Sequence, residues 1–359
     1  MSEPSVIQLS RAEVYVNSLS FGGSDAVAAA LSTNFIHLVD LNAKKTKQTY
    51  DVAKNVVGIH FDLSGNGAVL RAVDDSFGIH LFDVRSGSKK KSRLNPIVEN
   101  HLVTCSATSD NYIALASSTF LQTEPKKKKK KNDGTSSEDE DEIDEAAIPH
   151  VVSIFDIRGT TEPLITLKES HSDAVNCLAF MRDGKHLITG GSDGLINVFD
   201  VSMSNEDDAL KSTNQAESSV AKVCSLSKRL FYGCTDDNKC VVYSPNSPED
   251  VDLLFKKSAR PDHFLVDLLK GGQEERPIAM IECEESGKVS LSTVSVDGKH
   301  SEIIEEWSGH TDIVRSTAYN NGLLVTGGED GKIVAKQIDL RTSGGGKSKK
   351  EKKSKHKSF

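Results

Sequence analysis

Two stretches of this sequence share one pattern: LITGGSDGLINVFD at residues 187–200 and LVTGGEDGKIVAKQ at residues 324–337. In each, a short apolar run leads into a Gly/Asp turn, and a second strand-like run follows. Strand-like runs on both sides of such a turn predict a β-hairpin. A histidine lies upstream of each hairpin, His171 in SHSDAV and His310 in GHTDIV. The two stretches are therefore copies of one repeating unit.

Weaker copies of the unit fill the rest of the 359-residue chain. One position in the third strand of each copy can be aligned, and it falls at Val39, Phe82, Phe155, Phe199, Tyr243, Leu291 and Lys336. These positions are 43, 73, 44, 44, 48 and 45 residues apart, and a four-stranded propeller blade takes about 40 to 45 residues. The long step is explained by an insertion at residues 124–147. We predict an all-β chain, a seven-bladed β-propeller over residues 1–342 with this insertion in blade 3.

The repeat resembles the WD40 repeat, which carries Gly-His near its start and Trp-Asp at its end. The resemblance implies a structural hydrogen-bonded set in two repeats: His171, Thr189, Asp193 and Phe199 in the fourth, and His310, Thr326 and Asp330 in the seventh. A buried imidazole can donate to the turn aspartate, and each buried polar group left unpaired costs about 1–3 kcal/mol. No repeat ends in Trp-Asp, and Lys336 holds the Trp position of the seventh. Because the same trio recurs at matching positions, it is interpreted as structural and not as a catalytic triad.

The resemblance also implies how the ring closes, because WD40 propellers usually take the outer strand of their last blade from the N-terminus. The segment Ser5–Leu9 is a suitable strand, and it precedes the first expected inner strand, Val16–Phe21. We therefore predict that it pairs beside Ile333–Ile338.

No pattern that carries catalysis occurs in the chain. There is no G-x-S-x-G, P-loop, H-E-x-x-H or strand-linked G-x-G-x-x-G motif. The six cysteines form no C-x-x-C pair, and the acidic stretch Glu282–Glu285 predicts a solvated turn. We expect no enzyme activity, no cofactor and no metal site. No apolar run is long enough to span a membrane and no secretory signal is visible, which predicts an intracellular monomer.

The insertion contains a run of six lysines followed by an acidic run, PKKKKKKNDGTSSEDEDEIDE at residues 125–145. Such a segment cannot bury a core and predicts a disordered loop. A nuclear-import signal is the interpretation favoured for Lys126, Lys127, Lys128, Lys129, Lys130 and Lys131; a solubilising loop is the alternative. Ser136 and Ser137 precede acids, as acid-directed kinases prefer, and phosphorylation would add roughly 1.5 to 2 negative charges per site beside the lysines.

The C-terminal segment 343–359 is rich in lysine and is also expected to be disordered. Its positive charge suits non-specific RNA contact or retention in the nucleus or nucleolus. Except for the terminal Phe359, no aromatic residue is interleaved for base stacking, so sequence-specific recognition is not expected. The whole chain carries a net charge of −8. The tail contributes +6 and the insertion −3, so the remaining body carries −11 and disfavours a folded nucleic-acid surface.

These features favour a non-catalytic scaffold that binds other proteins through a flat face or the channel opening, with a nuclear location. Two alternatives remain open from the sequence. One is a non-catalytic subunit of an RNA-processing or RNA-modifying complex, in which the lysine segments steer RNA. The other is a substrate receptor for a ubiquitin ligase.

Overall fold

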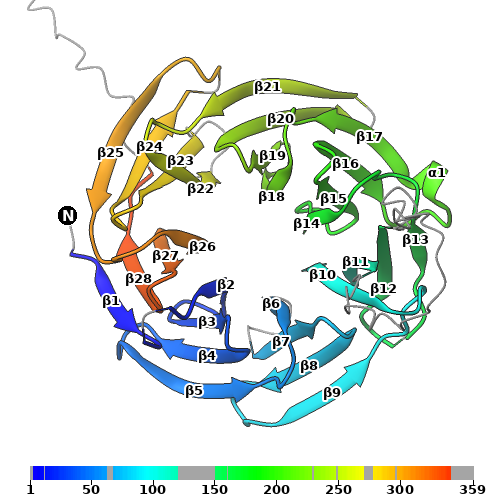
Figure 1. Cartoon of the computed structure of the whole chain (residues 1–359), viewed down its shortest axis with the longest axis horizontal. Helices are drawn as coiled ribbons and strands as arrows, with labels where there is room; N and C mark the ends of the chain where they lie inside the picture. The colour runs from blue at the N-terminus through cyan, green and yellow to red at the C-terminus, as the bar shows by residue number, and fades with distance from the viewer. Residues whose placement is uncertain are drawn as a thin grey trace, which may run out of the picture.

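The computed structural model describes residues 3–11, 13–62, 68–119, 150–159, 161–228, 230–247, 250–270, 278–295 and 297–340. Over these residues the strands form seven four-stranded antiparallel sheets, arranged as blades around a central opening (Figure 1). The chain is therefore all-β and a seven-bladed β-propeller, which confirms the predicted fold. The predicted disordered segments, 124–147 and 343–359, lie outside the described residues.

The blades follow one another along the chain, each running from the channel outward. Blade 1 contains β2 (Val16–Phe21), β3 (Ala26–Leu31), β4 (Phe35–Asp40) and β5 (Lys45–Asp51). Blade 2 contains β6 (Val56–Phe61), β7 (Val69–Asp74), β8 (Gly78–Asp83) and β9 (Lys89–Arg93). Blade 3 contains β10 (His101–Thr108), β11 (Tyr112–Thr119), β12 (Val151–Asp156) and β13 (Ile165–Leu167). Blade 4 contains β14 (Val175–Phe180), β15 (His186–Gly191), β16 (Leu195–Asp200) and β17 (Leu210–Gln215), with the one-turn helix α1 (Glu206–Ala209) before its last strand.

The remaining blades have the same order. Blade 5 contains β18 (Val220–Ser227), β19 (Leu230–Thr235), β20 (Lys239–Ser247) and β21 (Asp250–Ser258). Blade 6 contains β22 (His263–Lys270), β23 (Ile278–Glu284), β24 (Val289–Val294) and β25 (Ser301–Trp307). Blade 7 contains β26 (Val314–Asn320), β27 (Leu323–Gly328) and β28 (Lys332–Gln337), and its outer strand is β1 (Ser5–Gln8).

The N-terminal strand closes the ring. β1 pairs antiparallel with β28, so that Ser5 lies opposite Ala335 and Gln8 opposite Lys332. Ile7 is buried at this seam. At the inner edge of the same seam, the Ser316 hydroxyl donates to the Val16 carbonyl at 2.7 Å. The predicted closure is confirmed.

The core lies between neighbouring blades. Tyr50 of blade 1 packs on Phe82 of blade 2, with ring centroids 4.2 Å apart, inside an apolar cluster drawn from both blades. Because each sheet is covered on both sides by its neighbours, inner strands are apolar on both faces. The first five residues of β12, Val151–Phe155, are all buried. This explains why several strands show no clean alternation of apolar and polar residues.

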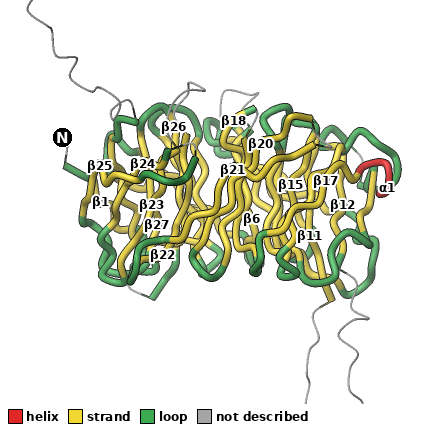
Figure 2. The backbone as a smooth tube through the Cα atoms, turned by 90° about the horizontal axis from the view of Figure 1, so that it is seen from above, coloured by secondary structure: helices red, strands yellow, loops and turns green. Residues whose placement is uncertain are grey.

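The up-and-down topology gives the disc two distinct faces, which Figure 2 shows edge-on. We call one the insertion face; it carries the links between second and third strands and the links from blade to blade. Thr119 and His150, the described residues on either side of the insertion, lie at this face because Thr119 ends β11 and His150 precedes β12. The opposite face, which we call the tail face, carries Leu340 because β28 runs away from the insertion face.

One position of the repeat alignment is wrong. In blades 1, 4 and 5 the ladder between the third and the outer strand shifts register immediately before the aligned residue. That residue is Val39 in blade 1, Phe199 in blade 4 and Tyr243 in blade 5. In blade 6 the shift falls between Leu291 and Ser292, so Ser292 and not Leu291 holds the equivalent position. β24 is buried along its whole length, so polarity did not reveal its register.

Candidate functional site at the central channel

A β-bulge occurs in every blade, in the ladder between the innermost strand and its neighbour. The register shifts lie at Val16/Ser18, Val56/Gly58, Val103/Cys105, Val175/Cys177, Val220/Lys222, Leu265/Asp267 and Val314/Ser316. A bulge adds one residue to a strand and redirects its side chain. We call the seven extra residues the bulge ring: Asn17, Val57, Thr104, Asn176, Ala221, Val266 and Arg315. Because innermost strands start at the insertion face, the ring surrounds that mouth of the channel.

The bulge ring also links blades to one another. The Thr104 hydroxyl of blade 3 donates to the Val175 carbonyl of blade 4 at 3.0 Å. The Asn176 amide of blade 4 donates to the Val220 carbonyl of blade 5 at 3.2 Å. Each acceptor is the residue that precedes the next bulge, so these contacts hold the ring of side chains in a fixed arrangement.

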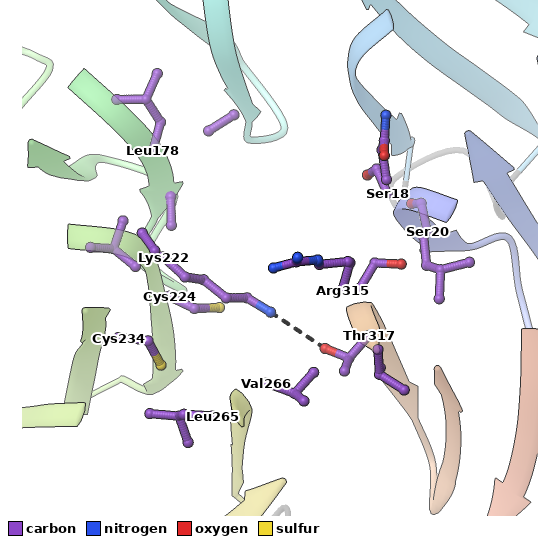
Figure 3. A pocket seen from close by; sticks show the side chains of 18 of the residues that line it. Ser18, Ser20, Leu178, Lys222, Cys224, Cys234, Leu265, Val266, Arg315 and Thr317 are labelled. Atoms are coloured by element: carbon purple, nitrogen blue, oxygen red, sulfur yellow. Dashed lines mark hydrogen bonds between the residues drawn. The ribbon is translucent and has the colours of Figure 1, made fainter. Parts of the chain in front are cut away.

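The channel contains a cavity of about 770 Å³ lined by residues of all seven innermost strands. Asn17, Ala221, Val266 and Arg315 of the bulge ring are among them. Arg315 extends into this space, between Ser18 and Ser20 on one side and Lys222 on the other (Figure 3). Its side chain is 56% exposed, and its Nε atom donates to the Glu329 carboxylate.

An ion pair in the channel wall joins three blades. In five blades the residue after the bulge is small, but blades 5 and 6 have Lys222 and Asp267 there, and the two are 2.6 Å apart (Nζ to Oδ2). The hydroxyls of Tyr232 and Thr317 also donate to the Asp267 carboxylate. The Lys222 ammonium reaches the Thr317 hydroxyl at 3.4 Å, the contact drawn in Figure 3. We call this group the Lys222–Asp267 latch.

The latch is charged, and its carboxylate is largely screened from water, whereas the Lys222 side chain is 34% exposed. Asp267 is 6% exposed. Burial alone would lower the pKa of Lys222, but the neighbouring Asp267 outweighs it and the pKa is raised. Burial and the same carboxylate raise the pKa of Tyr232 well above its ordinary value, so the phenol stays a donor.

A neutral histidine lies across the channel from the latch. His60 of β6 contacts the Ser106 hydroxyl of β10 through Nε2 at 3.0 Å. Burial, and secondarily the positive charge of Arg71, lower the pKa of His60 to about 4. His60 therefore contributes polarity without charge at neutral pH.

The structure brings together the residues assigned by the repeat pattern in blade 4. His171 Nδ1 lies 3.0 Å from Asp193 Oδ2, and His171 Nε2 lies 2.6 Å from Thr189 Oγ1. Asn197, which the pattern does not include, donates to the Ser170 carbonyl at 2.7 Å. Burial alone would raise the pKa of Asp193, but its hydrogen bond from His171 outweighs this and the pKa is lowered.

Blade 7 has the same arrangement. His310 Nδ1 lies 3.1 Å from Asp330 Oδ1, and Nε2 lies 2.9 Å from Thr326 Oγ1. Burial would raise the pKa of Asp330, but the His310 contact and backbone N–H donors hold it well below its ordinary value. Both sets tie a blade-to-blade link to a hairpin turn, outside the channel lining. Thr189 and Thr326 are 0% exposed, so neither hydroxyl is placed to act as a nucleophile.

The positions where Trp is expected are buried. Phe199 is packed in the core cluster between blades 3 and 4. Lys336 lies 4% exposed and forms an ion pair with Glu305 of blade 6, with Nζ and Oε1 2.7 Å apart. The departure from the repeat pattern at Lys336 is therefore compensated by a charge on the neighbouring blade.

The prediction of a solvated turn at Glu282–Glu285 is wrong for Glu282 and Cys283, which are buried strand residues. Glu282 belongs to β23 and is 1% exposed. Its carboxylate accepts from the Arg260 backbone N–H at 2.7 Å and from Arg260 Nε at 2.9 Å. Blade 6 therefore has an ion pair in place of the histidine set. Its buried acid is Glu282, and its cation is Arg260, which lies in the link between blades 5 and 6.

Sequence reasoning missed the latch and a buried aspartate in blade 2. Asp74 accepts from Gly78 N–H at 2.7 Å and lies 2.8 Å from His80 Nε2. The available signal was a charged residue inside an apolar strand run, as in VAKVC around Lys222 and LVDLL around Asp267.

The described residues leave some of the predicted sites out and allow two searches over the rest of the chain. Lys126–Lys131 and the serines Ser136 and Ser137 lie outside it. Within it, no group of three or more His, Cys, Asp or Glu side chains is arranged to hold a metal ion. The same residues include no helix of the length and apolarity that crossing a membrane requires.

The comparisons with known proteins agree with this geometry. The family model for the WD domain, G-beta repeat, matches residues 161–200 and 301–334. These two segments are WD40 repeats. The two matched segments contain both of the His/Thr/Asp sets described above.

Two curated proteins resemble parts of this chain. Minichromosome loss protein 1 of Schizosaccharomyces pombe is 26% identical over 136 residues, 36% of this chain and 16% of that protein. An uncharacterized WD repeat-containing protein of Saccharomyces cerevisiae is 26% identical over 202 residues, 52% of this chain and 50% of that protein. The alignments thus span half or less of the length of these relatives.

Solved propellers share the fold along nearly the whole chain. A chain in the crystal structure of the Mitotic Checkpoint Complex has a TM-score of 0.67 at 16% identity, covering 94% of this chain and 93% of that one. The Myceliophteria thermophila Cps50 (Swd1) β-propeller domain has a TM-score of 0.64 at 13% identity, covering 93% and 100%. At these identities the likeness concerns the WD40 propeller fold alone.

Proposed function

We propose that this WD40 protein is a non-catalytic scaffold for protein–protein interactions, and that its channel mouth on the insertion face receives a segment of the partner. The bulge ring is the observation that carries the proposal. Four of its seven residues, Asn17, Ala221, Val266 and Arg315, line a cavity of about 770 Å³, and the side chains of Thr104 and Asn176 donate hydrogen bonds to the next blade. A rigid concave site with a few oriented polar groups is typical of a binding surface.

Arg315 is the residue on which we expect the partner to depend most. Its side chain is more than half exposed and extends into the cavity, which the exposed Phe264 also lines. Arginine and aromatic residues carry much of the binding energy in protein interfaces. A partner segment with a carboxylate beside an apolar side chain would match this pair.

The test is affinity purification with mass spectrometry on the full chain and on Arg315→Gln. The control is Arg158→Gln, because Arg158 is also largely exposed and paired with an aspartate but lies on the outer part of blade 3. We expect partners that co-purify with the unchanged chain to be lost only from Arg315→Gln. Recovery of the same partners with both variants would contradict the proposal that the channel mouth binds the partner. Circular dichroism would check that both variants fold.

A nuclear location is proposed on the strength of Lys126–Lys131, and the similarity to Minichromosome loss protein 1 is consistent with it. Replacing the six lysines by alanine in a fluorescent fusion should reduce nuclear signal. Phosphorylation of Ser136 and Ser137 is proposed to mask the run, so Ser136→Ala/Ser137→Ala should increase nuclear signal. Unchanged distribution in both variants would contradict these roles.

An RNA-linked role is a second candidate, because Leu340, which leads into the lysine-rich segment, lies on the face opposite the channel mouth. RNA on the tail face and a protein on the insertion face would not compete for space. This candidate predicts salt-sensitive RNA binding by the full chain that is lost on deleting residues 346–359. No feature of the described residues favours the ubiquitin-ligase alternative over a general scaffold.

Residues 170–223 resemble WD repeat-containing protein 89, and we propose a relationship to that branch of the family. The run NEDDAL within this segment includes α1, and the Glu206 carboxylate accepts the backbone N–H groups of Lys168 and Glu169 at 2.6 and 3.0 Å. These contacts hold the link that leads to His171. The resemblance at NEDDAL therefore follows from a structural role of this run and does not indicate a shared binding partner.

A further inference from the structure

The outer strand of blade 2 has an unusual concentration of positive charge. β9 reads KKKSR at residues 89–93, and all five residues are exposed. Lysines on edge strands commonly protect sheets against unwanted pairing. The other outer strands carry at most two cations, and only β9 has four cations and no acid. Protection of an edge does not require this number.

The charge of β9 is incompletely neutralised by the rest of the protein. Lys89 donates to the Asp51 carbonyl at 2.8 Å and lies over the Phe82 ring, while Lys91 reaches the buried Asp74 at 3.5 Å. Lys90 and Arg93 form no ion pair with the described part of the chain. Residues 16–93, which make up blades 1 and 2, contain ten basic and seven acidic side chains, although the whole chain carries −8. Blades 1 and 2 therefore present a positive region on an acidic protein.

The backbone of β9 also has a free hydrogen-bonding edge. β9 pairs only with β8. The Leu94 N–H donates to the Phe77 carbonyl at 3.0 Å. Because donors alternate along an antiparallel ladder, the N–H groups of Lys90 and Ser92 also point to β8, and those of Lys89, Lys91 and Arg93 point away from it.

We propose that β9 is a docking strand for an extended acidic segment of a partner protein. The segment adds to blade 2 as a fifth strand, with its backbone pairing to the outward edge of residues 89–93. Its acidic side chains, spaced about 6.6 Å apart on each face of an extended chain, lie against the cations. This inference is independent of the channel mouth, which lies at the opposite end of the blade.

A protein segment fits this strand better than RNA does. Only a peptide can use both the outward N–H and the outward C=O groups of an edge strand. β9 displays no aromatic side chain for base stacking. A nucleic acid longer than the strand would extend over a surface whose net charge is negative, and the repulsion would oppose binding.

The first experiment measures fluorescence anisotropy of a short labelled peptide of alternating Glu and Thr with the full chain at low ionic strength. One variant changes Lys89, Lys90, Lys91 and Arg93 to Ser. The matched control changes four exposed lysines of other blades to Ser, Lys168, Lys185, Lys228 and Lys299. We expect the β9 variant to weaken binding by about tenfold and the control by less than about twofold. Equal losses in the two variants would overturn the proposal.

The second experiment separates strand addition from simple charge attraction. Lys91→Pro removes the charge and the outward N–H, whereas Lys91→Ser removes the charge alone. Proline is tolerated on an edge strand where its nitrogen faces outward, so both variants should fold. We expect Lys91→Pro to bind the peptide several times more weakly than Lys91→Ser. Equal affinities would overturn strand addition.

The same assay distinguishes other occupants. A labelled oligouridylate that loses more affinity than the peptide in the β9 variant would assign the strand to nucleic acid and overturn the proposal. Peptide binding that appears only after deletion of residues 138–145 would assign it to the chain's own acidic run, and would overturn a partner in trans.

Discussion

At the residue scale, charged side chains occupy places in this propeller where the repeat pattern leads one to expect apolar or small ones. Lys222 and Asp267 stand after two bulges, and Lys336 stands at a Trp position. Each is compensated by an opposite charge on a neighbouring blade. Charged pairs of this kind join particular blades, 5 to 6 and 6 to 7. The apolar clusters, by contrast, lie between every blade and the next.

The Lys222–Asp267 latch should show strong coupling in a double-mutant cycle. Lys222→Met leaves a buried carboxylate without its cation and should lower the free energy of unfolding by about 3 kcal/mol. Lys222→Met combined with Asp267→Leu should cost less than the sum of the two single substitutions, because no buried charge is left unpaired. Denaturant unfolding gives both values. Lys239→Met is the control, since its pair with Asp237 is exposed and worth less than about 1 kcal/mol.

An additive double mutant would contradict this prediction. It would mean that the two side chains do not depend on each other and that the latch does not join blades 5 and 6 as described.

His60 should make stability depend on pH between about 4 and 6.5. Its pKa is about 4 in the folded protein and about 6.5 in an unfolded chain, so in this range the unfolded state binds a proton that the folded state does not. The free energy of unfolding therefore falls as pH falls from 6.5 towards 4. His60→Asn should reduce this slope by about one proton, measured by denaturant unfolding across the range. His300→Asn, at an exposed position, is the control; equal slopes in all three proteins would contradict the assignment.

At the element scale, two features organise the ring: the seven bulges and the N-terminal strand. Six of the seven bulges follow a valine, and five are followed by Ser, Gly or Cys, so the sequence contains a Val-x-small repeat. This repeat recurs in more blades than the histidine sets do. It therefore marks the channel mouth in the sequence more widely than the histidine sets do.

Closure by β1 should contribute measurably to thermal stability. Deleting residues 1–10 removes the β1–β28 ladder and the buried Ile7, and leaves β28 with an open edge. We expect the melting temperature to fall by roughly 5–10 °C. Deletion of residues 346–359 serves as the control. An unchanged melting temperature after the N-terminal deletion would show that the ring does not need this strand.

At the scale of the whole molecule, the propeller separates its charged features in space. The insertion joins β11 to β12 at one face, the last described residue lies at the other, and the basic strand β9 lies on the rim. A rigid disc holds these three places apart, so partners at the channel mouth, rim and tail face need not exclude one another.

The insertion should be dispensable for folding. β11 and β12 are antiparallel neighbours, with Ser117 opposite Val151, so a short link can join them without moving either strand. Deleting residues 124–147 should change the melting temperature by less than about 3 °C. Scanning calorimetry on both proteins makes the comparison. A large loss of stability would show that the segment packs against the propeller.

Much of the fold follows from the sequence alone, because hairpins are local. Turn residues, strand lengths and the spacing of the repeats predict seven sheets, and the N-terminal strand was placed from its resemblance to WD40 propellers. The positions of His171, Asp193 and Thr189 followed from two well-preserved repeats. The register of β24 did not, because a strand buried on both faces carries no polarity signal.

The sequence by itself determined that this chain forms seven β-blades with a charged insertion in the third. Only the tertiary structure decided which side chains meet across blades: Lys222 with Asp267, Lys336 with Glu305, Arg260 with Glu282. The physical reason is that hydrogen-bonded hairpins depend on neighbours along the chain, whereas blade-to-blade contacts depend on how each sheet is turned about the channel. The repeats predicted from the sequence form the blades. The packing of the blades around the channel places Arg315 in the channel and β9 on the rim.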